Sequence, residues 1–97
     1  MSSGVQRSRN QIFFGTGAQK DVLGVGFRPR HVRLMNENGI TLEWFDHMAD
    51  ASAFKSVAAG DKTFVTTNAI TPLNDGFRIG TDSINGAGEK IHYVCSE

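Results

Sequence analysis

The sequence predicts a small all-β domain, an antiparallel β-sandwich with a jelly-roll-like arrangement, preceded by a flexible N-terminal arm. Apolar and β-branched residues occur in short runs, the clearest runs alternate with polar residues, and glycine-containing turns separate them. A chain of 97 residues, 39% of them hydrophobic, suffices for one domain with one core. We therefore place the arm at residues 1–10 and the sandwich domain at residues 11–97.

The arm and two strand candidates fill the first 30 residues. Residues 1–10 are rich in Ser, Arg and Gln and have no apolar anchor, so we expect a segment that orders only on a partner. Residues 11–14 are a short apolar run that ends at a Gly-Thr-Gly turn. Residues 22–27 are the next run, which contains two glycines and is stopped by Pro29.

Residues 31–35 and 40–45 have the clearest hairpin pattern. Both runs alternate, and the Asn-Glu-Asn-Gly turn between them contains residues that tolerate positive φ. Trp44 continues the apolar face of its run, whereas Phe45 falls on the other face. Because two consecutive rings cannot both enter the core from a regular strand, we predict a buried Trp44 and a Phe45 that contacts a subunit or partner.

Four further runs complete the predicted strands, at residues 53–57, 63–67, 77–79 and 90–95. Residues 70–76 contain Pro, Asn, Asp and Gly and predict a loop. Residues 48–57 alone also allow a helix, although their Ser, Phe and Val residues weaken that alternative. The single cysteine, Cys95, excludes an internal disulfide and is expected to be a small core or interface residue.

The net charge is zero, but its distribution is uneven. Residues 1–33 carry six basic residues and one acidic residue, whereas residues 34–97 carry four and nine. This asymmetry suits self-association or docking on a charged partner, and a mixed folded surface is an equally weighted alternative. We do not expect nucleic-acid binding, because the arginines are interleaved with apolar positions, nor a membrane span, because no apolar run is long enough. The residues that we assign to partner docking are Arg7, Arg9, Arg28 and Arg30.

We predict no catalytic, metal or cofactor site. Cys95 and His92 are three residues apart on one strand and therefore face opposite sides, which argues against a nucleophile–base pair. The polar clusters at residues 46–50 and 82–89 lack the ligand spacing of zinc or calcium sites and are better read as solvated turns. The glycine turns lack the Gly-Lys-Ser/Thr ending and the helix of a phosphate-binding loop.

Four motifs occur in an order that resembles small virion proteins of tailed bacteriophages. They are Gly-Phe-Arg-Pro-Arg-His-Val at 26–32, Trp-Phe at 44–45, Asp-Gly-Phe-Arg-Ile-Gly-Thr-Asp at 75–82 and Ile-Asn-Gly-Ala-Gly-Glu-Lys-Ile-His-Tyr at 84–93. Similar β-domains occur as capsid decoration (cement) proteins and at the ends of tail fibres. Cys95 departs from the pattern, since such domains have Ala or another small apolar residue there.

The resemblance implies a structural protein and not an enzyme. The favoured role is a capsid decoration protein on the virion surface that bridges subunits of the major capsid protein. Such a protein is expected to be a homo-oligomer, by preference a trimer, and to be in the host cytoplasm during assembly. The alternative is a carbohydrate- or receptor-binding module of a tail fibre or tail tip. That module would use loop carboxylates such as Asp46, Asp75 and Asp82. The compact length favours the decoration protein.

Overall fold

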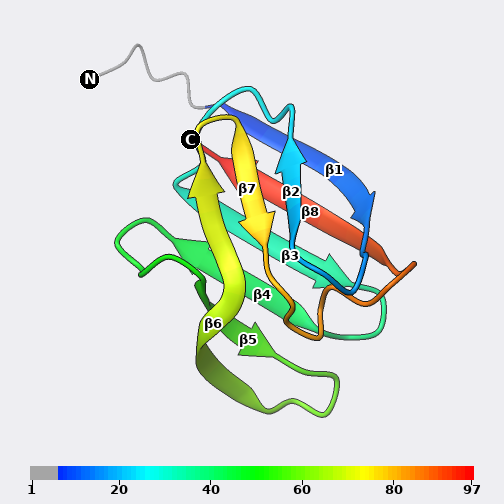
Figure 1. Ribbon diagram of the computed structural model, residues 1–97. Helices are drawn as coiled ribbons and strands as arrows, with labels where there is room; N and C mark the ends of the chain where they lie inside the picture. The colour runs from blue at the N-terminus through cyan, green and yellow to red at the C-terminus, as the bar shows by residue number, and fades with distance from the viewer. Residues whose placement is uncertain (1–6) are drawn as a thin grey trace.

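The computed structural model describes residues 7–97, and these residues form eight β-strands and no helix (Figure 1). Every pairing between neighbouring strands is antiparallel. A membrane-spanning helix is accordingly not found in this range. The strands are β1 (Ser8–Phe14), β2 (Lys20–Leu23), β3 (His31–Asn36), β4 (Thr41–Phe45), β5 (Ser52–Ser56), β6 (Lys62–Leu73), β7 (Gly76–Ile79) and β8 (Lys90–Ser96).

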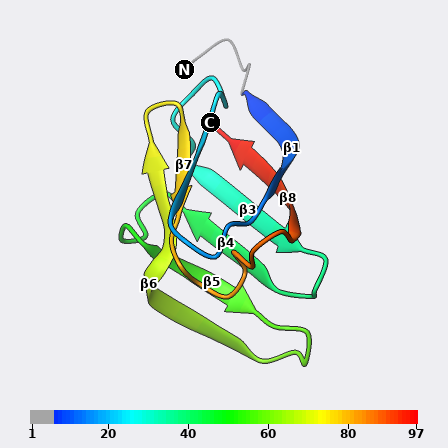
Figure 2. The ribbon, with the colours of Figure 1, turned by 45° about the vertical axis from the view of Figure 1, so that its right-hand side comes forward.

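All eight strands belong to one sheet, in the order β1-β8-β3-β4-β5-β6-β7-β2. The sheet curls until its two edge strands, β1 and β2, lie near each other, which makes a nearly closed barrel (Figures 1 and 2). No strand pairing joins β1 to β2 within residues 7–97. We call the opening between these two strands the seam.

The all-β antiparallel prediction is confirmed, and each of the eight predicted runs lies in or overlaps a strand. The predicted hairpin is also confirmed, because β3 pairs with β4 through Val32 opposite Trp44 and Leu34 opposite Leu42. The sandwich and the jelly roll are not confirmed, because the strands form one curled sheet. Short alternating strands are common to sandwiches and barrels, so the sequence pattern did not separate the two.

The strand predicted at residues 53–57 is confirmed as β5, and the weaker helical alternative for residues 48–57 is not observed. Two local predictions are corrected. Most of the predicted loop at 70–76 belongs to β6, which continues to Leu73. Pro72 is tolerated in that strand because the pairing of β6 with β5 ends at Ile70, beyond which one edge of β6 is open. Residues 8–10 of the predicted arm are the start of β1 and pair with β8, while residues 1–6 lie outside the described residues.

The inward-facing side chains of the sheet form one core. At its centre three aromatic rings, from Phe13, Phe77 and Tyr93, have centroids 5.3–6.1 Å apart. Such edge-to-face and tilted arrangements are favourable for aromatic pairs. The other buried apolar side chains are those of Val22, Val25, Phe27, Val32, Leu34, Leu42, Trp44, Ala53, Ala69, Ile70, Ile79, Ile84, Ile91 and Cys95.

A bulge in β6 bends the strand, and the bend lets a single sheet close on itself. The pairing between β5 and β6 jumps from Ala53 opposite Val65 to Ser52 opposite Ile70. Within this irregular stretch Asn68 has a φ of 61°, in the left-handed region that Asn tolerates. Gly80 packs directly against the bend, where a Cβ atom would lie 2.6 Å from the backbone of Asn68. A glycine is therefore required at this contact.

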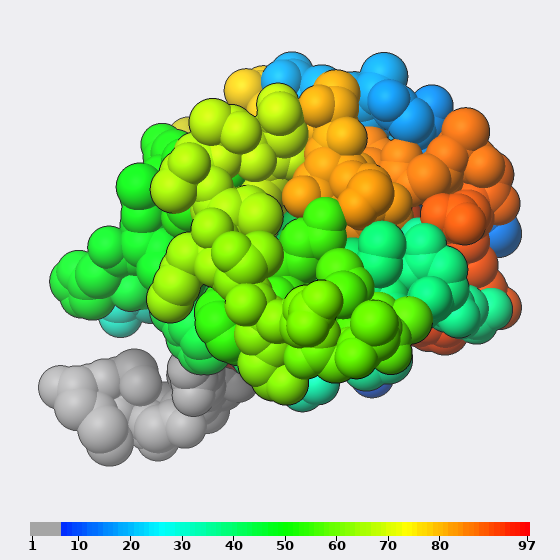
Figure 3. Space-filling model, turned by 90° about the horizontal axis from the view of Figure 1, so that it is seen from below, coloured from blue at the N-terminus to red at the C-terminus, as the bar shows by residue number. Residues whose placement is uncertain are grey.

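The β7–β8 connection covers one end of the barrel (orange in Figure 3). Its Ile84 side chain is fully buried. The side-chain amide of Asn85 donates to the carbonyls of Ala18 and Gly80 at 2.5 and 2.9 Å, and its Oδ1 accepts from the Thr16 amide at 2.9 Å. The Ile-Asn motif that contributes to the phage resemblance thus has a structural role, since it ties the β7–β8 connection to the β1–β2 connection.

Candidate binding surfaces

An exposed apolar cluster lies on the outer surface of β1, β8 and β3. Ile12 and Met35 both lie opposite His92 in the register of these strands, and Val94 is two residues further along β8 on the same face. All three apolar side chains are exposed. We call Ile12, Met35 and Val94 the outer patch.

Trp44 and Phe45 occupy opposite sides of β4, as predicted. Trp44 is 3% exposed and its indole Nε1 donates to the Ala49 carbonyl at 3.1 Å. Phe45 is 49% exposed, and its ring stacks on that of His31 with 4.8 Å between the centroids. The exposed ring is available for a partner contact, and its role at an interface stays a prediction.

A second exposed aromatic surface lies on the hairpin of β5 and β6, which projects beyond the rest of the sheet (Figure 1). Phe54 and Phe64 lie opposite each other across this hairpin, with ring centroids 5.2 Å apart. Phe64 is 68% exposed. Alternation along the strands favours the core for most of the aromatic residues, but these two rings are exceptions, because Phe54 lies opposite the outward-facing Glu43.

The structure places Arg7 and Arg9 in contacts within the barrel. The Arg7 guanidinium donates to both carboxylate oxygens of Glu97 and, at 3.0 Å, to the Gly26 carbonyl. It also lies 5.3 Å from the centroid of the Phe27 ring. The hydrogen bonds from Arg7 lower the pKa of Glu97. Arg9 donates to the Val25 carbonyl at 3.3 Å. These two arginines therefore link β1 to the segment after β2, which corrects the prediction of a free docking arm at these positions.

Arg28 and Arg30 lie in the connection between β2 and β3, and both are exposed. Arg30 forms an ion pair with Asp46 at 3.2 Å, which joins this connection to the one after β4. Within residues 7–97, Arg28 has no ion-pair partner. The assignment of these two residues to partner docking stays a prediction.

The carboxylates suggested for carbohydrate binding do not share one rim. Asp75 and Asp82 lie beyond opposite ends of β7. Asp75 accepts hydrogen bonds from the amides of Gly24 and Gly26 at 3.2 and 2.8 Å, and Asp82 forms a largely buried ion pair with Lys55 at 3.0 Å. With Asp46 paired to Arg30, all three carboxylates have partners within the chain.

Cys95 is fully buried on the inner face of β8, and burial raises the pKa of its thiol to about 12. Such a thiol is protonated at neutral pH and unreactive. Across residues 7–97, no group of three His, Cys, Asp or Glu side chains is placed to hold a metal ion.

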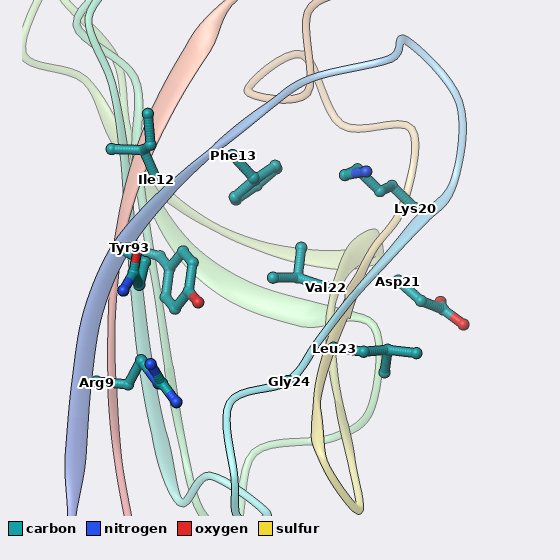
Figure 4. A pocket seen from close by; sticks show the side chains of 10 residues that line it. Arg9, Ile12, Phe13, Lys20, Asp21, Val22, Leu23, Gly24 and Tyr93 are labelled. Atoms are coloured by element: carbon teal, nitrogen blue, oxygen red, sulfur yellow. The ribbon is translucent and has the colours of Figure 1, made fainter.

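The seam contains a cleft of about 370 Å³ that the sequence analysis did not identify. Figure 4 shows that Arg9 and Phe13 from β1, Lys20 and Val22 from β2, and Tyr93 from β8 point into it, whereas Asp21 and Leu23 point away. A second cleft of about 500 Å³ adjoins it at Arg9 and Gln11. No local signal predicts these clefts, because they depend on how far the sheet curls.

Comparisons with protein-family models, with curated proteins and with solved structures gave no match.

Proposed function

We propose that this chain is a bacteriophage structural protein that decorates the capsid and stabilises it by bridging subunits of the major capsid protein. The observation that carries the proposal is the concentration of large apolar side chains on the outside of a small barrel. The outer patch, Phe45 and Phe64 are all exposed, and they come from five different strands. Exposed apolar groups of this kind mark surfaces that become buried in an assembly. The order of the four phage-like motifs is the reason for proposing that this assembly is a bacteriophage capsid.

The mechanism is multivalent burial. A copy that contacts two capsid subunits at once makes each contact more persistent, because the second contact forms within an already tethered complex. A homo-oligomer, by preference a trimer, would multiply the effect by presenting several copies of the same surface. The carbohydrate-binding alternative has no comparable support, since Asp46, Asp75 and Asp82 are dispersed and have partners within the chain.

The test uses virions of the phage that encodes this chain. We expect electron cryo-microscopy of purified particles to reveal the barrel on the capsid surface, and we expect particles that lack it to open at a lower temperature. Added protein should restore the lost stability, whereas protein with Met35→Lys in the outer patch should bind the shells at least about tenfold more weakly, because a charge would enter the contact. A matched Lys62→Gln variant should bind like the parent. Virions that contain no copy of the chain would refute the proposal.

A further inference from the structure

The backbone of β1 offers a free edge to the seam. The Glu97 amide donates to the Arg7 carbonyl, and the Gly15 amide donates to the Glu89 carbonyl, both at 2.9 Å. These contacts fix which positions of β1 bond to β8, because such positions alternate along an antiparallel pair. Arg9, Gln11 and Phe13 therefore bond to β8. The amides and carbonyls at the even-numbered positions point toward the seam, namely those of Ser8, Asn10, Ile12 and Phe14.

This edge has few features that protect edge strands from pairing. Proteins shield such edges with prolines, bulges, very short strands or inward-pointing charges, and β1 has only the last of these. β1 has seven residues, contains no proline and pairs with β8 without a register shift. The only charge within it is Arg9, on the inner side. β1 can therefore accept an added strand, and Arg9 determines which strand fits.

The inner side of the seam has unpaired positive charge. Arg9 and Lys20 both point into the cleft, and neither has an ion-pair partner within residues 7–97. The nearby Asp21 does not compensate them, since it points away and binds Arg78 at 2.7 Å. The outer margins are apolar instead, with exposed Ile12 on β1 and exposed Leu23 on β2.

We propose that the seam binds an extended segment of a partner protein that adds to the free edge of β1. Successive side chains of a strand point to opposite faces. The bound segment therefore alternates acidic residues, which face Arg9 and Lys20, with apolar residues, which lie beside Ile12 and Leu23. An uncharged or basic strand would leave both cations buried without a partner, so the same two residues provide selectivity. The proposal does not depend on the virion role.

The experiment uses a blocked seven-residue peptide that alternates valine and glutamate, titrated into the ¹⁵N-labelled protein and followed by NMR. The amide signals of Ser8, Asn10 and Ile12 should shift, because these groups gain hydrogen-bond partners. Arg9→Gln and Lys20→Gln should each weaken binding about threefold to tenfold, because a charge-assisted contact is lost. The matched controls, Arg33→Gln and Lys62→Gln, alter cations outside the seam and should not change the affinity.

Two further probes separate strand addition from simple anion binding. Asn10→Pro removes an amide that faces the seam and should abolish binding. If this variant does not fold, a peptide whose alternate amides are methylated provides the same test on the parent protein, and it should not bind. The proposal is overturned if the peptide causes no shift at about 1 mM, near the weakest affinity of interest. It is also overturned if a valine–lysine peptide binds equally well, if the shifts lie outside the seam, or if inorganic phosphate displaces the peptide while methylated peptide binds unimpaired.

Discussion

Trp44 and Phe45 are neighbours in the sequence, but burial gives them different energetic roles. Trp44 fills the core and satisfies its indole N–H with the Ala49 carbonyl, so its removal would leave a cavity. The Ala49 carbonyl would keep the Ser52 amide and hydroxyl as donors. Phe45 contacts mainly His31 and solvent. The period of two along β4 is enough to predict this difference from the sequence, because it depends only on the strand itself.

We expect Trp44→Ala to lower the free energy of unfolding by about 3–5 kcal/mol, as truncation of a large core side chain does. Phe45→Ala on the same strand is the matched control and should lower it by less than about 1 kcal/mol, since its ring is half exposed. Urea unfolding of both variants measures the difference. Equal losses would mean that Phe45 belongs to the core.

Asn85 contributes to stability through hydrogen bonds that its position in the sequence does not reveal. Asn85→Ala leaves the carbonyls of Ala18 and Gly80 and the amide of Thr16 without this partner at a partly buried site, although the Ala18 carbonyl keeps the Thr16 hydroxyl as a donor. We expect a loss of about 2–4 kcal/mol, given the cost of unsatisfied buried groups. Asn74→Ala, in the exposed turn between β6 and β7, should change stability by less than about 0.5 kcal/mol. Similar losses from both variants in urea unfolding would show that the hydrogen bonds of Asn85 do not stabilise the barrel.

At the scale of elements, the strands could be predicted and the bends could not. Each strand contains local alternation or β-branched and aromatic residues, and these features predict a strand from the sequence alone. All eight predicted runs therefore lie in or overlap a strand. The bulge of β6 depends on Asn68 meeting Gly80, which follows β7, and this tertiary contact has no local signature in the sequence. The same limit explains the seam cleft, whose cations Arg9 and Lys20 come from the two edges of the sheet.

The start of β1 is held by a contact whose strength depends on pH. The hydrogen bonds from Arg7 lower the pKa of Glu97 below its usual value of 4.5. A lowered folded-state pKa means that the stabilising contribution is complete above about pH 4.5 and is lost as the pH falls through the lower folded-state value. The ion pair is exposed, so the effect is small and is weakened by salt.

We therefore expect Glu97→Gln to accelerate amide exchange at the start of β1 at pH 7 relative to the parent. At pH 3 the parent carboxylate becomes increasingly protonated, so the two proteins should become more alike once exchange is corrected for its intrinsic pH dependence. Hydrogen exchange followed by NMR measures this. A difference between parent and variant that is the same at both pH values would show that charge is not the cause.

At the scale of the whole molecule, the first and last strands pair with each other, so the barrel depends on contacts between the two ends of the chain. β8 lies between β1 and β3, and loss of β1 would leave one edge of β8 unpaired and would remove the Phe13 ring from the core. The sequence did not predict this, because the Ser, Arg and Asn residues at 8–10 have no apolar pattern; their strand structure comes from pairing with β8.

Deletion of residues 1–10 should consequently destabilise the whole barrel and not merely remove a docking segment. The deletion eliminates the pairs from Ser8 opposite Ser96 to Asn10 opposite Val94, together with the contacts of Arg7. At roughly 1 kcal/mol for each backbone hydrogen bond lost, we expect about 2–4 kcal/mol less stability. The control carries Ser8→Ala and Asn10→Ala, which alter outward side chains but keep the backbone ladder, and should melt close to the parent. If the shortened chain melts like this control, residues 1–10 do not contribute to the stability of the barrel. These residues would then be free to dock on a partner.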